Sequence, residues 1–137
     1  MSNKNLAIDP DSLYKIPGFH QVMASQGRKT IHIAGQAPYD EHMELIGAED
    51  YKLQAIKALQ NIATALAAAG AQPSDVVSSV LYVKALDTTG AAKAIMEAMA
   101  TALDGQPFPA HAFSIIGVAA LADPRVLVEI TAVAALD

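Results

Sequence analysis

The clearest hydrophobic pattern lies in residues 51–86, where a helical periodicity gives way to a run of β-branched residues. Apolar side chains recur at three- and four-residue steps and would share one face of a helix: Ile56, Leu59, Ala63 and Leu66. The opposite face, predicted to meet water, carries Lys57, Gln60, Asn61 and Thr64. Gly70 follows as the predicted C-cap, because glycine adopts the left-handed backbone without a steric penalty. Residues 76–83 predict a strand that is apolar on both faces, and one helix can cover only one of them.

The segments before this unit predict two strands. Residues 21–25 and 30–34 flank the short polar segment 26–29, a pattern typical of a β-hairpin. Gly35-Gln36-Ala37-Pro38 ends the second strand, since proline cannot donate to a strand ladder. We expect residues 1–12 to form a flexible lead-in.

The segments after it predict one more helix and two more strands. The second helix should run from Thr88 to Leu103, with Asp87 or Thr88 as N-cap. Its core-facing stripe is Ile95, Met99 and Leu103. Residues 112–120 and 126–134 read as apolar strands. The order β-β-α-β-α-β-β, with room for one extra short strand, predicts a single α+β domain over residues 1–137. Its two helices would cover one face of one sheet, and the other face would pack against another subunit.

The amino-acid composition favours an oligomer, and the sequence also bears on the cellular location of the protein. The chain is 53% hydrophobic and 17% charged, which is apolar for a monomer, so we expect an oligomer. No apolar run approaches the roughly 20 residues that cross a bilayer, so no membrane contact is expected. The polar, acidic N-terminus is not typical of a signal peptide, and a cytoplasmic location is the default expectation. Without cysteine there is no thiolate nucleophile and no cysteine metal site.

The charge distribution argues against a nucleic-acid partner. The net charge is −5, and the nine basic residues are scattered, with only Arg28 and Lys29 adjacent. Nucleic-acid affinity rests mainly on clustered basic groups that neutralise phosphates, so no strong binding is expected. The histidines, including His32 and His42, show no metal-ligand spacing, and we expect no metal site.

Six short motifs occur in order between about Gly18 and the C-terminus: Gly35-Gln36-Ala37-Pro38, Ala68-Ala69-Gly70, Asp75-Val76-Val77, Leu81-Tyr82-Val83, Gly117-Val118-Ala119-Ala120-Leu121 and Val128-Glu129-Ile130. Together they resemble the RidA/YjgF family, which also carries an older endoribonuclease label. The resemblance implies a chorismate-mutase-like α+β fold with one mixed sheet. It also implies a homotrimer with small-molecule sites in the clefts between subunits, which would supply the second cover that residues 76–83 require.

The resemblance also implies a chemistry, the hydrolysis of reactive imines or enamines without a metal or organic cofactor. In the family an arginine binds the substrate carboxylate, as a planar fork of donors favours. A glutamate activates the attacking water. Glu129 matches that glutamate, and Phe19 falls where an aromatic side chain lines the cleft. The arginine is missing: counting forward from Pro109-Ala110 places His111 there, and counting backward from Gly117 places Phe113.

Two functions therefore remain as alternatives, and a third is less favoured. The chain is either a hydrolytic deaminase or related hydrolase with Glu129 as catalytic residue, or a non-catalytic trimer that binds a small molecule or partner protein. Phe19, His111 and Phe113 are the expected ligand contacts, and a protonated His111 could stand in for the arginine. Outside the resemblance, Glu129 reads as an edge-strand carboxylate facing water. Cleavage of RNA is the weakest option on charge grounds.

Overall fold

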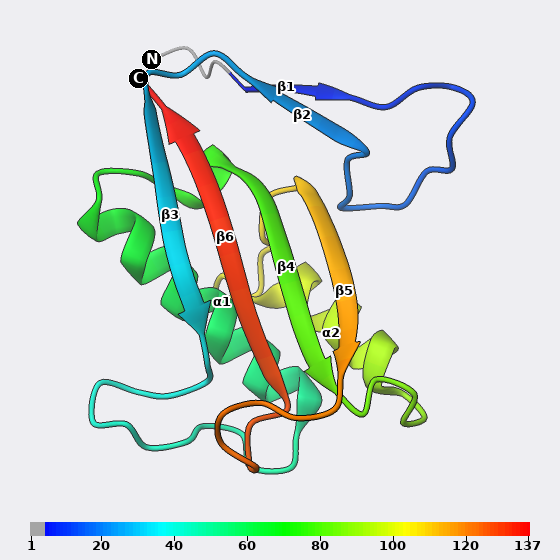
Figure 1. Ribbon diagram of the computed structural model, residues 1–137, viewed down its shortest axis with the longest axis vertical. Helices are drawn as coiled ribbons and strands as arrows, with labels where there is room; N and C mark the ends of the chain where they lie inside the picture. Colours follow the sequence, from blue (N-terminus) through cyan, green and yellow to red (C-terminus); the bar gives the residue numbers. More distant parts are fainter. Residues whose placement is uncertain (1–4) are drawn as a thin grey trace.

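A mixed β-sheet with two helices on one face forms the body of the protein (Figure 1). The computed structural model describes residues 5–137. Its elements in chain order are β1 (Asn5–Ile8), β2 (Val22–Ser25), β3 (Lys29–Gln36), α1 (Tyr51–Ala68), the 3₁₀ turn η1 (Pro73–Asp75), β4 (Val76–Lys84), α2 (Ala91–Thr101), β5 (Ala112–Val118) and β6 (Val128–Leu136). The predicted α+β class and element order are confirmed, with β1 as the extra short strand.

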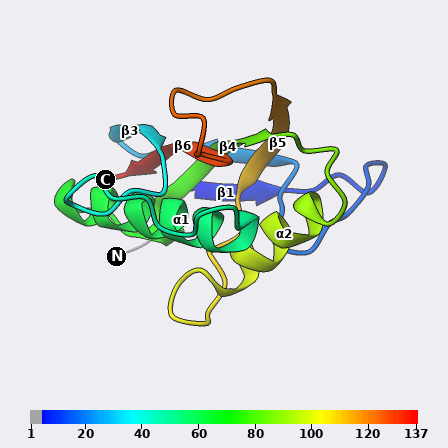
Figure 2. The same cartoon turned by 90° about the horizontal axis from the view of Figure 1, so that it is seen from below.

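Four strands lie in the order β3-β6-β4-β5. β6 runs antiparallel to both β3 and β4, and β5 runs parallel to β4 at the edge of the sheet. Both helices lie side by side against the same face, as the view from below shows (Figure 2). Parallel pairing of β4 and β5 requires a crossover connection, and α2 provides it.

The core lies between the helices and the sheet. α1 begins after Asp50, whose side chain accepts a hydrogen bond from the Leu53 amide at 2.9 Å. It ends before Gly70, whose φ of 79° confirms the predicted left-handed position. Leu59 and Leu66 are buried as predicted, whereas Ile56 and Ala63 are only partly buried. On the polar face, Thr64 is exposed and Lys57, Gln60 and Asn61 are partly buried.

The predicted hairpin between residues 21–25 and 30–34 is wrong. β2 pairs with β1 in a separate two-stranded sheet, and β3 pairs with β6. The turn pattern at residues 26–29 favours a hairpin only locally. Pairing with the nine-residue β6 gives β3 more hydrogen-bonded partners than the four-residue β2 could. The chain therefore changes sheets at Gly27, which packs so closely on Leu136 that a Cβ there would lie 2.8 Å from the Leu136 carbonyl oxygen.

Two boundaries also differ from expectation. α2 begins at Ala91 rather than Thr88, because Gly90 occupies the N-cap with a φ of 85°. Neither Asp87 nor Thr88 caps the helix. Within the segment expected to be flexible, residues 5–8 form β1, while residues 1–4 lie outside the described residues.

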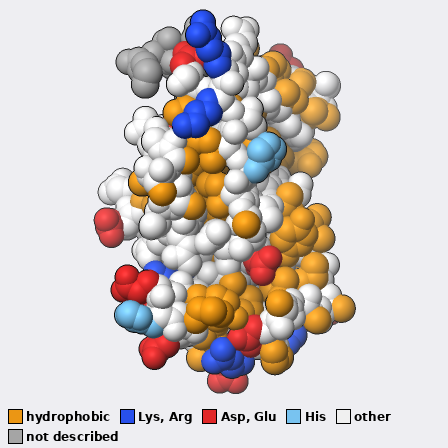
Figure 3. Space-filling model, turned by 60° about the vertical axis from the view of Figure 1, so that its left-hand side comes forward, with side chains coloured by type: hydrophobic (Ala, Val, Ile, Leu, Met, Phe, Trp, Pro, Cys, Tyr) orange, Lys and Arg blue, Asp and Glu red, His pale blue; other side chains and the backbone are white. Residues whose placement is uncertain are grey.

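The second face of the four-stranded sheet carries no helix, and we call it the uncovered face. Burial alternates along β6, so that Val128, Ile130 and Ala132 face the helices. The residues between them point to the uncovered face and are partly buried: Glu129, Thr131 and Val133. Seen from the β3 side, hydrophobic side chains gather over the middle of the molecule and most charged ones lie near its two ends (Figure 3). Among the described residues, no helix is both long and apolar enough to span a membrane.

Candidate functional site

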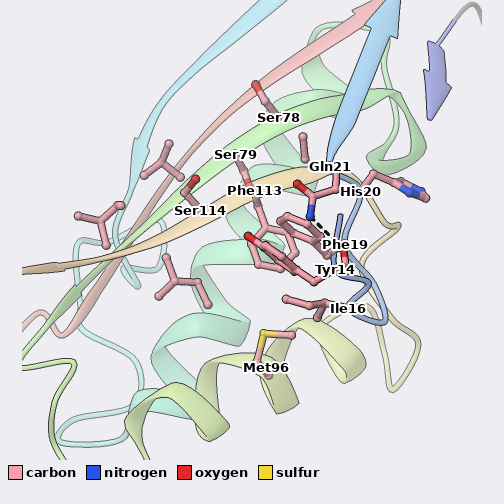
Figure 4. A pocket seen from close by; sticks show the side chains of 14 residues that line it. Tyr14, Ile16, Phe19, His20, Gln21, Ser78, Ser79, Met96, Phe113 and Ser114 are labelled. Atoms are coloured by element: carbon pink, nitrogen blue, oxygen red, sulfur yellow. Dashed lines mark hydrogen bonds between the residues drawn. The ribbon is translucent and has the colours of Figure 1, made fainter. Parts of the chain in front are cut away.

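A pocket of about 710 Å³ lies at the edge of the sheet along β5, and we call it the β5 pocket. Its walls come from the segment before β2, from the adjoining parts of β4 and β5, and from α2 (Figure 4). The side chains that line it include Tyr14, Ile16, Phe19, Ser79, Met96 and Phe113. The lining is therefore mostly apolar, with a few hydroxyl and amide groups.

Three aromatic rings lie in contact with one another along this pocket. Phe19 and Phe113 meet edge to face with ring centroids 5.1 Å apart, and Tyr14 stacks on Phe19 at 6.3 Å. Such geometries are the ones that aromatic pairs prefer. Tyr14 is 66% exposed, so the outer rim of the pocket is open to solvent or to another protein surface.

The segment that carries Phe19 is held against the start of β5. Phe19 forms a parallel β-bridge with His111, and the His20 amide donates to the His111 carbonyl at 3.0 Å. At the rim, the ring Nδ1 of His20 lies 2.7 Å from the Asp9 carboxylate. The Gln21 amide also donates to that carboxylate at 2.8 Å, and both hydrogen bonds hold the pKa of Asp9 below its usual range. No sequence motif marks Asp9 or His20.

His111 lies beneath the pocket rather than in it. Its side chain is buried, and both ring nitrogens already have partners: Ser79 Oγ lies 2.6 Å from Nε2, and the Pro109 carbonyl lies 2.8 Å from Nδ1. Burial lowers the pKa of His111, more than the bond to Pro109 raises it. The structure therefore does not support His111 as a protonated group that binds a substrate carboxylate. The ring is enclosed, and burial favours its neutral form.

Glu129 lies on the uncovered face, away from the lining of the β5 pocket. On β6 it stands opposite Tyr82 of β4, and Tyr82 in turn stands opposite Ile116 of β5, which does line the pocket. Its carboxylate lies directly over Gly35 of β3, where a Cβ would overlap Oε2 and come within 2.9 Å of Cδ. The absence of a side chain at Gly35 is what gives the carboxylate this position.

The two arginines of the chain take no part in the pocket. The Arg125 guanidinium pairs with Asp123 at 2.7 Å, and the Tyr39 hydroxyl donates to the same carboxylate at 2.8 Å. The contacts with Arg125 hold the pKa of Asp123 well below its usual range. Arg28 lies between β2 and β3. Among residues 5–137, no group of three or more histidine, aspartate and glutamate side chains is placed to hold a metal ion.

The sequence profile of the endoribonuclease L-PSP family matches residues 11–136. A Rid-family protein of unknown function from Yersinia pestis, YyfB, is 34% identical; the match covers 97% of this chain and 99% of that one, with a TM-score of 0.85. This chain belongs to the Rid/YjgF family. The Rid-family member RidA from an Antarctic Psychrobacter is 32% identical over 82% of this chain and 88% of that one, with a TM-score of 0.64. YjgF of E. coli is 28% identical over 94% and 92%, with a TM-score of 0.62. No curated protein has a matching sequence.

In this Rid-family chain, the four expected site residues occupy two places. Phe19 and Phe113 meet in the β5 pocket, with His111 behind them, whereas Glu129 lies across Tyr82 on the uncovered face. Sequence reasoning missed Ser79, which lines the pocket. Two adjacent polar residues, Ser78 and Ser79, inside an otherwise apolar strand were the available signal, because a buried hydroxyl needs a partner.

Proposed function

We propose that this Rid-family protein hydrolyses a small reactive imine or enamine, with Glu129 activating the attacking water. The observation that carries the proposal is the Glu129 carboxylate, held over Gly35 on a sheet face that no helix covers. In the reaction, the water oxygen bonds to the imine carbon, and Glu129 takes a water proton and gives it to the nitrogen, which forms a carbinolamine. Glu129 then moves the remaining hydroxyl proton to the nitrogen while the C–N bond breaks, giving a carbonyl product and ammonia or an amine.

The site we propose is completed by a second copy of the chain. Partly buried apolar side chains on the uncovered face, including Val80 and Val133, would be removed from water if the sheets of three subunits packed together. Such packing would also cover exposed apolar residues at the pocket rim, Tyr14 and Ile116. The carboxylate of one subunit would then face the aromatic pocket of a neighbour.

The lining of the β5 pocket supports a preference for uncharged substrates. It contains aromatic, aliphatic and hydroxyl side chains but no arginine or lysine. Hydrogen bonds to a charged group contribute roughly 1.5–3 kcal/mol, which is about tenfold to a hundredfold or more in affinity. We therefore expect small 2-imino acids such as 2-iminopropionate to be poor substrates, and apolar or aromatic imines without a carboxylate to be better ones.

The experiment compares Glu129→Gln with the unmodified protein. Imines are generated in situ, and release of the carbonyl product is followed for 2-iminopropionate and for a carboxylate-free aryl imine. We expect faster turnover of the aryl imine by the unmodified protein and loss of turnover in Glu129→Gln, with the same assembly mass by light scattering. Full activity of the variant would show Glu129 to be structural. Efficient turnover of 2-iminopropionate would contradict the substrate preference.

A non-catalytic binding protein of the same fold is the second candidate. It is favoured by one observation: no aspartate or glutamate is among the residues that line the β5 pocket. This alternative predicts saturable binding of the aryl compound, no turnover, and the same affinity in Glu129→Gln. Cleavage of RNA, which the family's older label suggests, is disfavoured by the net charge of −5 and the scattered basic residues. We expect no salt-sensitive binding to a generic single strand.

A further inference from the structure

A serine that lines the β5 pocket and a histidine buried beneath it have the geometry of a nucleophile and its base. Ser79 Oγ and His111 Nε2 lie 2.6 Å apart, within the range found for activated nucleophiles. Ser79 belongs to the lining of the pocket and is 8% exposed, whereas His111 is 1% exposed and does not line it. Ser79 is therefore the member of the pair that borders the pocket.

The second ring nitrogen of His111 determines the direction of this hydrogen bond. Nδ1 lies 2.8 Å from the Pro109 carbonyl, and a carbonyl oxygen can only accept, so Nδ1 carries the hydrogen. In a neutral ring Nε2 is then an unprotonated acceptor, and the Ser79 hydroxyl donates to it. Burial, which lowers the pKa of His111, keeps the ring in this neutral form. A third group thus orients the base, as in serine hydrolases, with a backbone carbonyl in place of a carboxylate.

The surroundings keep the pair in place. The His111 ring meets the Phe108 ring at 5.6 Å and the Phe113 ring at 5.6 Å, so it has little freedom to turn. On the backbone side, the bridge to Phe19 fixes residue 111 against the segment before β2. The position of the base is therefore set by packing on both sides, which general-base catalysis requires.

We propose that Ser79 is a nucleophile activated by His111, and that the β5 pocket catalyses acyl transfer from small apolar or aromatic esters to water. Ser79 Oγ bonds to the ester carbonyl carbon while its proton passes to Nε2. The C–O bond to the leaving group breaks, and the leaving alkoxide or phenoxide takes that proton. Water then attacks the acyl carbon, gives a proton to Nε2, and Ser79 Oγ departs with it. The products are a carboxylic acid and an alcohol or phenol.

The residues that line the pocket indicate the class of substrate it would accept. Tyr14, Phe19 and Phe113 contribute aromatic rings, Ile16 and Met96 add apolar surface, and no lysine, arginine, aspartate or glutamate is among the residues that line the pocket. An acyl or aryl group of benzene size fits a pocket of about 710 Å³ in both size and polarity. Glu129 takes no part in this reaction, so the acyl transfer and the imine hydrolysis can fail separately.

The decisive test is labelling of the folded, unmodified protein with an alkyl fluorophosphonate, followed by mapping of the adduct by peptide mass spectrometry. The serine oxygen displaces fluoride from phosphorus, so the adduct marks the nucleophile. We expect the label on Ser79, and we expect it to disappear in urea, since the pair forms only in the folded chain. A label spread over other serines, or a folded protein with Ser79 unlabelled, would overturn the proposal and leave the pair as a buried hydrogen bond.

Variants then test the role of the base. His111→Gln keeps a hydrogen-bonding group near the Nε2 position but cannot take a proton, so labelling and p-nitrophenyl butyrate turnover should fall roughly a hundredfold or more. Ser79→Ala should abolish both. The control is Ser25→Ala, an exposed serine on β2, which should leave both unchanged. Unchanged labelling of Ser79 in a folded His111→Gln protein would refute the assignment of His111 as base.

Discussion

At the scale of single residues, His111 connects stability to pH. Its ring is buried and its pKa is lowered from the ordinary value of 6.5, mainly by loss of hydration. In the unfolded chain the same ring takes up a proton near pH 6.5. The titratable side chain whose charge acts on it is His20, which is paired with Asp9. Below about pH 6.5 the unfolded state therefore binds more protons than the folded state, so the free energy of unfolding falls as pH falls.

We predict that part of this acid sensitivity belongs to His111 alone. Urea midpoints measured at about pH 7.5 and about pH 5.5 should fall more in the unmodified protein than in His111→Gln, because glutamine does not titrate. Both proteins share the carboxylates that also titrate in acid, so the difference between the two falls isolates His111. Equal falls would mean that His111 becomes protonated in the folded protein without penalty.

A second residue-scale prediction concerns Gly35. Its backbone is not in the left-handed region, so alanine is conformationally allowed, but the new Cβ would overlap Glu129 Oε2. The carboxylate sits at the end of a flexible side chain and can move aside, so Gly35→Ala should change the free energy of unfolding by less than about 1 kcal/mol. Imine hydrolysis should nevertheless drop about tenfold or more, because a displaced base misses the water.

The measurement for Gly35→Ala pairs a denaturation curve with the product-release assay. Gly105→Ala supplies the contrast: its φ of 85° is in the left-handed region and nothing lies near it, so it should lose stability without losing hydrolysis. If Gly35→Ala keeps full activity, the position of the carboxylate over Gly35 does not matter for the chemistry.

At the scale of elements, Gln54 joins α1 to the start of β6. It is fully buried; its Oε1 accepts from the Leu127 amide at 2.7 Å, and its Nε2 donates to the Arg125 carbonyl at 3.1 Å. These bonds satisfy the Leu127 amide and the Arg125 carbonyl, two backbone groups just before β6. The helix thereby holds the loop that leads into the central strand and its Glu129.

We predict that Gln54→Leu destabilises the protein by roughly 1–3 kcal/mol, since it leaves a buried amide without an acceptor while keeping the side-chain volume. Thr64→Ala on the exposed face of the same helix should stay within about 0.5 kcal/mol. Urea denaturation of both variants provides the comparison. A neutral Gln54→Leu would show that water reaches the Leu127 amide.

At the scale of the whole molecule, the uncovered face predicts the assembly. We expect light scattering to give about 43 kDa, three times the chain mass of 14.3 kDa, because closed cyclic assemblies bury the same patch on every copy. Val133→Lys places a charge in the middle of this face, between His32 and Ser78 on the neighbouring strands. This variant should shift the mass toward a folded monomer.

Thr64→Lys on the exposed side of α1 is the matched control and should keep the mass of the unmodified protein. Circular dichroism of Val133→Lys distinguishes dissociation from unfolding. A stable monomer of the unmodified protein would contradict the trimer and, with it, the proposal that a second copy completes the site.

The sequence by itself determined most of the local structure. The periodicity over residues 51–68 and the glycine at position 70 set the first helix, because helical contacts join residues three and four apart. The apolar run from Val76 predicted β4 for a similar reason, since strand preference follows from the residues themselves. For the site, composition and spacing marked no residue. The family resemblance pointed to Phe19, Glu129 and either His111 or Phe113, and the structure brings Phe19 and Phe113 together with His111 behind them.

Only the tertiary structure decided which strands pair and which polar groups are enclosed. β3 lies beside β6, a strand almost one hundred residues later in the chain, and not beside β2 as the turn between them predicted. Ser79 and His111 come from different strands, and Gln54 meets a loop that follows β5. Pairings of this kind depend on the free energy of the whole packed sheet, and a local pattern contains no information about the partner that a distant segment will supply.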